Sequence, residues 1–290
     1  QPRMNAFAYM VISALGFSMM GLFVKLASLR GFPVLEIITA RAAVSLVLSY
    51  WDIRRARVAP FGFNKKILFL RGFLGFLALL AVYKSLTLLP LAEATLIQYL
   101  HPLFTAILAW HFLKEPISRE TTLCILLAVL GLLIITQPKS LGVQSIPTAA
   151  LLMALFGAAM SGAAYTTVRY LSQKEHSSVI ILYFPLICLP STIILGWQDF
   201  IMPVGSDWLI LFSIGIFTQI GQIGLTRGIA LEPAGKAAAI GYVQIVFAAI
   251  LGIIVLGETL SLSTIIGSAL IISGLIVNQL CSLKSGRLPQ

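Results

Sequence analysis

The sequence predicts an all-α integral membrane protein with ten transmembrane helices arranged as two inverted five-helix repeats. Composition and an internal repeat carry this prediction. Hydrophobic residues make up 59% of the chain and charged residues only 10%, whereas a soluble domain typically has about 25% charged residues. The apolar runs are long and continuous, which favours helices over the alternating pattern of a transmembrane barrel.

The internal repeat is visible without a gap when residues 83–118 are aligned with residues 226–261, a shift of 143. Twelve of the 36 aligned positions are identical. The matches that apolar composition does not explain are Pro90 with Pro233, Tyr99 with Tyr242, and Glu115 with Glu258. An odd number of spans in each copy places the two copies in opposite orientations. We therefore expect repeats at residues 1–140 and 141–290, joined in one transmembrane bundle.

The ten spans are apolar runs of about 20 residues, the length that crosses a bilayer. They are expected at residues 6–28, 33–51, 67–89, 91–113, 120–137, 147–170, 178–197, 207–230, 234–256 and 262–281. The first run lacks the short apolar core and small-residue cleavage site of a signal peptide, so it is expected to be retained.

The charges of the loops predict which side of the membrane each loop faces. The loop at residues 52–66 holds five arginine and lysine residues, whereas its counterpart at residues 198–206 holds Asp199 and no basic residue. Since positive loops stay in the cytoplasm, the two loops should face opposite sides and both termini should be cytoplasmic. These short loops explain the net charge of +10 without a nucleic-acid partner. The lack of large soluble domains favours a bacterial inner membrane.

Polar residues within the spans share helix faces, at spacings of three, four and seven residues. These faces carry Ser18 and Lys25; Gln98, His101 and Thr105; Tyr165, Thr166 and Arg169; and Gln219, Gln222 and Thr226. The shift of 143 also equates His101 with Gln244. Because polar groups that face lipid are costly, these faces point into the bundle. They either line a central path or form hydrogen bonds between helices.

Two embedded basic residues are candidates for substrate contact. His101 lies roughly 15 Å into its span, and Pro102 after it predicts a kink or a local opening. His101 could bind substrate, carry a proton, or bond to a neighbour while neutral. Arg41 lies roughly 12 Å into its span and is either functional or part of a structural ion pair. Lys84 and Arg227 are equivalent near span ends, where they either reach toward the interface or lie at a cavity mouth.

The positions of the acidic residues argue against a cation carrier, and those of the cysteines argue against a metal or cofactor site. None of the ten carboxylates falls in the middle third of a span, and a cation carrier usually needs one there. The embedded charges favour a neutral, zwitterionic or anionic substrate. Glu115 and Glu258 are expected to fix helix ends.

Cys124, Cys188 and Cys281 lack paired spacing, so we expect buried thiols, no metal and no cofactor.

The chain resembles the drug/metabolite transporter superfamily, EamA type, over residues 6–281. The pattern that carries the resemblance is a small-residue segment at 92–97, then Pro102, then an apolar run ending at Glu115; its second copy runs from 236–239 to Glu258 and has Ile245 where proline would be expected. The resemblance implies ten helices in two inverted repeats around a cavity lined by the first, third, fourth, sixth, eighth and ninth spans. Family members export amino acids or carry nucleotide sugars and organic acids. The glutamate that the small multidrug branch has in its first span is missing here.

The function predicted from the sequence is secondary transport of an amino acid or related carboxylate-bearing metabolite by alternating access. Arg41 or Lys84 would attract the carboxylate. The remaining predicted contacts are hydrogen bonds from Gln98, His101, Gln219, Gln222 and Gln244, and cavity walls formed by Tyr83, Tyr99, Tyr165 and Tyr242. Proton coupling would rest on His101.

Three alternatives stay open at this point. A multidrug or cation exporter, a passive channel and a membrane-embedded enzyme would each use a similar apolar chain. No carboxylate pair, metal cluster or nucleophile–base set marks an enzyme site, and no ring of charge marks a channel filter. The glycines Gly221, Gly224 and Gly228 could pack helices within one chain or between chains, so the oligomeric state is open.

Overall fold

The computed structural model of the chain describes residues 5–88, 97–136, 148–257 and 262–284. Every regular element in these ranges is a helix, which confirms the all-α prediction. The elements are α1 (Ala6–Leu29), α2 (Val34–Ala56), α3 (Lys65–Leu88), α5 (His101–Leu108), the π-helix η1 (Ala109–Leu113), α6 (Arg119–Thr136), α7 (Thr148–Ser172), α8 (Ser177–Gly196), the 3-10 helix η2 (Trp197–Asp199), α9 (Asp207–Leu231), α10 (Ala234–Ile240), α11 (Val243–Leu256) and α12 (Leu262–Lys284).

Several of these helices have the dimensions of membrane spans. Within the described ranges, six helical stretches are long and apolar enough to cross a membrane: Ala6–Leu29, Val34–Ala56, Thr148–Ser172, Ser177–Asp199, Asp207–Leu231 and Ala234–Val255. Each overlaps a predicted span. The largest difference is at α2, which continues past the predicted end at residue 51 because Arg54 and Arg55 occupy its last turn, where basic side chains favour the helix dipole. The full count of ten spanning helices stays a prediction.

The fourth and ninth predicted spans are interrupted at equivalent places. α5 begins after a turn at residues 99–100, and a turn at residues 241–242 separates α10 from α11. Pro102 lies in the first turn of α5, where its missing N–H group is not needed. The second copy has Ile245 in place of proline and is interrupted nonetheless. A proline is therefore not required for the break, and both spans are interrupted by a turn near mid-length.

The two interrupted spans also end in the same backbone conformation. Lys114 and Gly257, which the shift of 143 equates, have φ values of 57° and 66°, in the left-handed region. Each is the residue that ends its helix. This conformation costs an L-residue roughly 1 kcal/mol and costs glycine little. The two copies therefore share a left-handed backbone conformation at this position, although the first copy has lysine there and the second has glycine.

Lys114→Gly is expected to raise the free energy of unfolding by about 1 kcal/mol, because glycine adopts this conformation without the steric cost. Thermal denaturation of the purified protein in detergent measures the effect. Lys114→Ala is the matched control, since it removes the same side chain and keeps the Cβ atom. Equal melting temperatures for the two variants would contradict the prediction.

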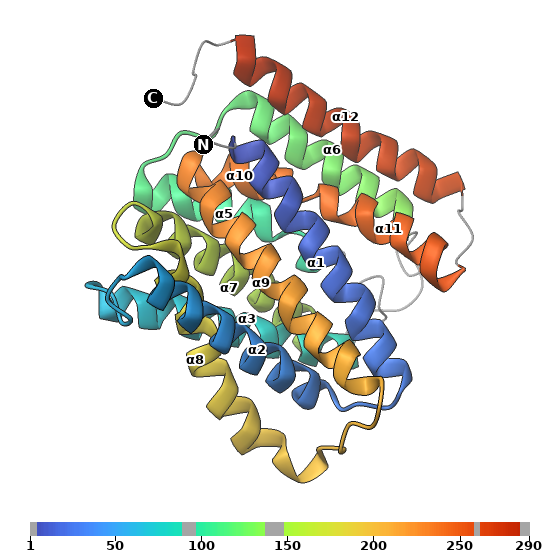
Figure 1. Ribbon diagram of the computed structural model, residues 1–290. Helices are drawn as coiled ribbons and strands as arrows, with labels where there is room; N and C mark the ends of the chain where they lie inside the picture. The colour runs from blue at the N-terminus through green and yellow to red at the C-terminus, as the bar shows by residue number, and fades with distance from the viewer. Residues whose placement is uncertain (1–4, 89–96, 137–147, 258–261, 285–290) are drawn as a thin grey trace.

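Glycines pack α9 directly against α1. Cβ atoms placed on Gly221, Gly224 and Gly228 would lie within 2.8 Å of atoms of Phe17, Ser13 and Met10, respectively. The residue numbers fall along α1 as they rise along α9, so the two helices run antiparallel (Figure 1). The three glycines therefore pack two helices of the same chain together. Of the two roles left open by the sequence, this is packing within one chain.

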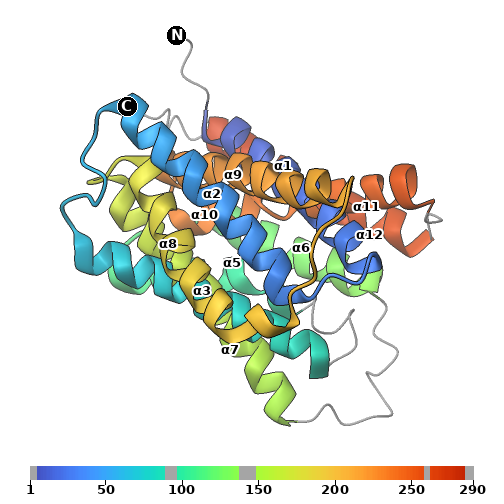
Figure 2. The ribbon, with the colours of Figure 1, turned by 60° about the horizontal axis from the view of Figure 1, so that its bottom comes forward.

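α2 and α8 form a second antiparallel pair between the two halves of the chain. Thr39 near the start of α2 donates a hydrogen bond to Thr192 near the end of α8, over 2.9 Å between the hydroxyl oxygens. At the other end of the pair, the Ser178 hydroxyl donates to the Asp52 carboxylate. Figure 2 shows the two helices side by side. They hold the second place in the two predicted repeats, so a helix and its counterpart run in opposite directions.

α6 and α12, which hold the fifth place in the two predicted repeats, are also antiparallel. A Cβ atom on Gly131 would lie 2.9 Å from the side chain of Ile271, and one on Gly274 would lie 3.2 Å from that of Leu127. The pair covers one flank of the bundle (Figure 1). Opposite directions for two counterpart pairs are what an inverted duplication requires.

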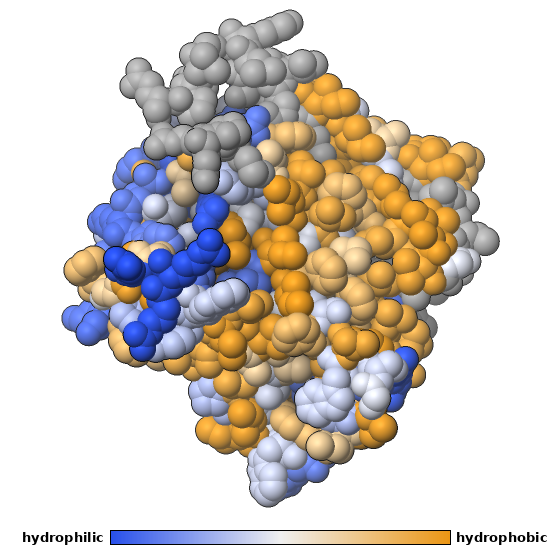
Figure 3. Space-filling view, in the orientation of Figure 1, coloured by the Kyte–Doolittle hydropathy of each residue, from blue (hydrophilic) through white to orange (hydrophobic). Residues whose placement is uncertain are grey.

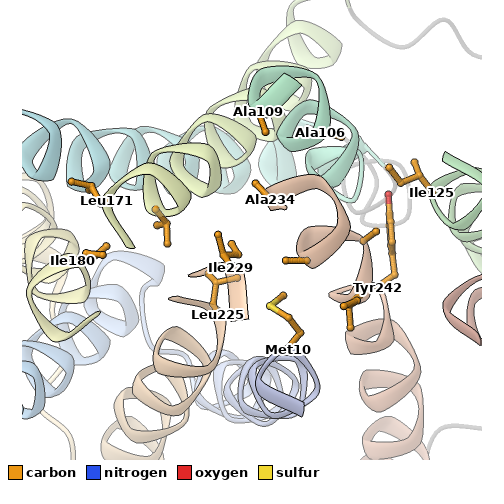
Figure 4. Packing of buried hydrophobic residues seen from close by; sticks show 14 of the residues in the cluster. Met10, Ala106, Ala109, Ile125, Leu171, Ile180, Leu225, Ile229, Ala234 and Tyr242 are labelled. Carbon is orange, nitrogen blue, oxygen red and sulfur yellow. The ribbon is translucent and has the colours of Figure 1, made fainter. Parts of the chain in front are cut away.

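Buried apolar residues join the two halves at the centre. Figure 4 shows Met10 of α1, Ile229 of α9 and Ala234 of α10 converging, with Ala106 of α5 close to α10. A Cβ atom on Gly235 would lie 2.7 Å from the Cβ atom of Ala106. Small residues therefore let the short helices α5 and α10 meet, and this contact brings the two interrupted spans together.

Basic side chains gather at one end of the bundle. The Glu175 carboxylate, in the α7–α8 connection, accepts backbone N–H groups of Phe63 and Asn64 over 2.8 and 2.7 Å. The α2–α3 connection, with its exposed lysines and arginines, therefore lies beside the α7–α8 connection. Figure 3 shows hydrophilic residues concentrated at this end and a hydrophobic surface over most of the remaining visible face. This distribution fits a bundle embedded in lipid with one basic end.

Candidate functional site

Two arginines meet at one aromatic ring inside the bundle. The guanidinium carbon of Arg41, on α2, lies 5.2 Å from the centre of the Phe184 ring on α8, and that of Arg71, on α3, lies 5.7 Å from the same centre. Cations are attracted to the electron-rich face of such a ring. Pro185 follows Phe184 inside α8, so one helical hydrogen bond is missing beside the ring. Three helices thus supply the centre of a cationic site.

Each guanidinium keeps an unused donor. Arg71 is only 4% exposed, and its Nη2 donates to the Oε1 atom of Gln222 over 3.2 Å. The Nε atoms of Arg41 and Arg71 are buried and have no hydrogen-bond partner. Among the described residues, neither arginine forms an ion pair with a carboxylate. Buried charged donors without partners are costly, so this arrangement can hold an anionic group.

Glu36, the acidic residue nearest to Arg41 in sequence, is used elsewhere. It is 7% exposed, and its carboxylate accepts the backbone N–H of Ile201 over 2.8 Å. The bond ties the start of α2 to the segment after η2. The structural ion pair considered for Arg41 is therefore not formed with Glu36.

A cluster of rings connects the arginines to the interrupted spans. The rings of His101 and Tyr165 are 5.0 Å apart in an edge-to-face arrangement, and the Tyr99 ring lies 6.5 Å from the His101 ring. Tyr165 is also close enough to Arg41 and Arg71 to interact with their charges. Tyr165 on α7 therefore lies near both the arginines and His101, and the histidine Nδ1 atom is buried without a partner.

Tyr99 and Tyr242, equated by the repeat, contact each other. Their ring centres are 6.5 Å apart, and the Tyr242 hydroxyl donates to the backbone oxygen of Tyr99 over 2.9 Å. A residue can touch its own counterpart only near the axis that relates the two copies. The predicted wall residues thus lie at the junction of the repeats, with Tyr242 1% exposed.

Gln98 is held at the edge of this cluster. Its amide nitrogen donates to the Ser161 hydroxyl on α7 over 3.1 Å. Its Oε1 atom is buried and has no partner. Since the flanking contact fixes the amide, the free oxygen is available to a donor group of a substrate.

The structure describes the surroundings of three other predicted contacts, Gln219, Lys84 and Gln244. The Gln219 side chain is fully engaged with α2: its oxygen accepts from Ser45 and Ser49 over 2.6 and 3.3 Å, and its nitrogen donates to Ser49 over 2.9 Å. Lys84 is exposed on α3. Gln244 is half-buried, and its backbone oxygen accepts from Ser18 over 3.0 Å. The side chain of Tyr83 lies outside the described residues. Their roles in substrate binding stay predictions.

Arg169 and Glu115 lie at the basic end of the bundle and join three helix ends. Arg169 Nε donates to the Glu115 carboxylate over 2.6 Å, and its Nη1 donates to the backbone oxygens of Ile229 and Ala230 over 2.9 and 2.7 Å. The second Glu115 oxygen accepts the N–H of Ala234, the first residue of α10, over 2.7 Å. Glu115 fixes a helix end, as predicted, and Arg169 is engaged in this junction. Glu258, its counterpart, lies outside the described residues.

Arg71 and Phe184 are the residues that sequence reasoning missed. Because Arg71 follows Lys65 and Lys66 closely in the sequence, it resembles a further basic residue of that loop. Phe184 is one of many aromatic residues in apolar runs. A signal for Arg71 was its place inside a predicted span, between apolar residues and beside Gly72. Only the packing of α3 on α8 joins it to Arg41.

The described residues contain no group of three or more metal-binding side chains. Cys124 and Cys188 are buried free thiols, as predicted; the side chain of Cys281 is outside the described part.

Comparison with known proteins agrees with this arrangement. The EamA-like transporter family matches residues 4–137 and again residues 148–279. The chain is 34% identical over 264 residues to the pseudopaline exporter of Pseudomonas aeruginosa, covering 90% of this chain and 91% of that one. It is 30% identical over 255 residues to solute carrier family 35 member G1 of Mus musculus, covering 83% and 68%.

A solved crystal structure with 18% sequence identity superposes with a TM-score of 0.84 over 97% of this chain and 98% of the other, which shows a shared fold. The two family matches divide the chain near the predicted repeat boundary, and the apolar helices make it an integral multi-pass membrane protein. The resemblance to drug/metabolite transporters is confirmed. The chain belongs to the EamA-like transporter family.

Proposed function

We propose that this transporter moves an amino acid or related carboxylate-bearing metabolite by alternating access. Two inverted repeats, residues 1–140 and 141–290, would rock around a site at mid-depth. The observation that carries the proposal is the convergence of Arg41, Arg71 and the His101–Tyr165 ring pair from both halves of the chain. A site shared by both halves opens to one side or the other when the halves move.

The helix pairs support the inverted arrangement. α2 and α8 run antiparallel although they hold the same place in the two repeats, and Tyr99 touches its counterpart Tyr242. These contacts are compatible with a two-fold axis in the membrane plane. On this arrangement ten helices span the membrane.

The charges at the site favour an anionic group over a cation. Two guanidinium groups at one ring, with Arg71 buried and Arg41 partly buried, repel a cation, and the described residues place no carboxylate against them. A multidrug or cation exporter would need a buried carboxylate. The similarity of this chain to a pseudopaline exporter supports export as the direction of transport.

The basic end of the bundle supports a cytoplasmic location for both termini. The α2–α3 and α7–α8 connections lie together there, and α1 begins and α12 ends toward the same end (Figure 1). We place the protein in a bacterial inner membrane with this end inside.

Counterflow in proteoliposomes tests the proposal. Vesicles loaded with an unlabelled solute should accumulate the same labelled solute above its external concentration, which a passive channel cannot do. A panel of labelled amino acids and organic acids identifies the substrate class. Arg41→Ala and His101→Ala are each expected to lower the initial rate at least about tenfold, since each loses a charge-assisted or buried hydrogen bond. Size-exclusion chromatography checks that both variants are folded.

Full counterflow in both variants would remove the proposed site. Downhill equilibration without counterflow would favour a channel. Counterflow confined to lipophilic cations would favour the exporter alternative.

A further inference from the structure

The site has one basic group more than a single carboxylate needs. Arg41 and Arg71 lie against the same Phe184 ring, and the sum of their distances to its centre limits the separation of the two guanidinium carbons to about 11 Å. One small molecule can span this distance. We infer that the substrate carries two separate anionic groups, one bound by Arg41 and the other by Arg71. The inference rests on the proposed function, since it concerns the same site.

Charge balance is the first argument. The two guanidinium groups carry like charges beside the same ring and therefore repel each other, and Arg71 is buried. In the described part of the chain, no carboxylate pairs with either of them. A single anion leaves one of the two cations without a counter-charge, which is costly away from water. A double anion compensates both and also relieves their repulsion.

The unused donors are the second argument. An arginine binds a carboxylate with two parallel N–H groups, and the Nε–H is often one of them. Both Nε atoms are buried and without a partner. Gln222 holds Arg71 through Nη2 and so orients the remaining edge of the guanidinium. The structure therefore offers two unpartnered Nε donors, one for each anionic group.

Gly75 is the third argument, because it leaves room for this arrangement. A Cβ atom on Gly75 would lie 2.7 Å from Nη1 of Arg71 and 2.8 Å from a ring carbon of Phe184. Any larger residue would push the guanidinium and the ring apart. Gly75 is thus a positioning residue for Arg71.

Binding of a matched series to the purified protein tests the inference. The probes are succinate, glutarate, phosphoglycolate, butyrate and succinamate, the monoamide of succinate, measured by calorimetry in detergent. The better of the two dicarboxylates should bind at least about 30-fold more tightly than succinamate, since one charge-assisted pair is lost with the amide. Tighter binding of phosphoglycolate than of the dicarboxylates would assign one of the anionic groups to a phosphate.

Variants assign the two anionic groups to the two arginines. In Arg41→Gln and in Arg71→Gln the dicarboxylate should lose its advantage over succinamate, so that their affinities agree within about threefold. Gly75→Ala should reduce the advantage in part. Lys66→Gln, an exposed residue on the same helix as Arg71, should keep it. If Arg71→Gln does not fold, Arg41→Gln alone decides.

Equal affinities for dicarboxylate and monoamide in the wild-type protein would overturn the inference, as would an unchanged preference in Arg41→Gln. Lack of binding by every doubly charged probe would also overturn it. The counterflow result is interpreted separately from the binding result. Dicarboxylate binding without any counterflow counts against the carrier function alone, whereas counterflow of singly charged solutes that succinate does not inhibit counts against the double-anion site alone.

Discussion

Arg71→Ala is expected to reduce transport about 100-fold. Arg71 contributes a charged donor to the substrate and also holds Gln222 by a hydrogen bond of 3.2 Å. Loss of a charge-assisted bond at a buried site costs about 3 kcal/mol, which corresponds to about 100-fold in affinity. The initial rate of counterflow at low substrate concentration measures the effect.

Two further substitutions separate charge from geometry. Arg71→Lys keeps the charge and loses the planar pair of donors, so an intermediate rate is expected. Lys66→Ala removes one positive charge from the exposed start of the same helix and should leave the rate within twofold of wild type. A rate within twofold of wild type for Arg71→Ala would contradict the assignment of Arg71 to the site.

The second large effect is on stability and is expected for Glu115→Ala. The Glu115 carboxylate binds Arg169 and also accepts the first N–H group of α10. Arg169 and Glu115 are 19% and 15% exposed, so water replaces little of what is lost. Removing one partner of such a pair leaves a poorly solvated cation, and we expect the free energy of unfolding to fall by about 3 kcal/mol.

Thermal denaturation in detergent measures this loss, and a second ion pair provides the control. Arg30 pairs with Asp207 at the opposite end of the bundle, where the arginine side chain is 45% exposed. Arg30→Ala should have little effect because water and salt screen an exposed pair. Glu115→Gln keeps an acceptor for Ala234 and should be intermediate. A melting temperature for Glu115→Ala equal to that of Arg30→Ala would refute the structural role of the junction.

The repeat could be recognised from the sequence because its matches include proline, tyrosine and glutamate, which apolar composition does not explain. The identity of Tyr99 with Tyr242 predicted equivalent segments, and the structure shows both segments interrupted nearby. The proline Pro102 is replaced by Ile245 in the second copy, yet both segments are interrupted. A proline in the first turn of a helix fits without a kink, so the break depends on the contacts around it.

Most of the predicted polar faces are buried or half-buried, whereas Lys25 is exposed, and the partners of these faces were not predictable. Gln219 and Gln222 are three residues apart on one face of α9, and both are buried. Gln219 bonds to two serines of α2, whereas Gln222 bonds to Arg71 of α3. Helical periodicity gives the direction of a side chain and says nothing about the helix that it meets.

The sequence by itself determined the membrane class, the position of most helices, the internal repeat and the family, because apolar length, loop charge and repeated residues are local properties of the chain. Only the tertiary structure joined Arg71 to Arg41 across Phe184 and bound Arg169 and Glu115 into one junction. These pairs lie far apart in sequence, and their distances follow from how closely the helices approach. That approach is decided by small residues such as Gly75 and Gly224, whose effect depends on the atoms opposite them.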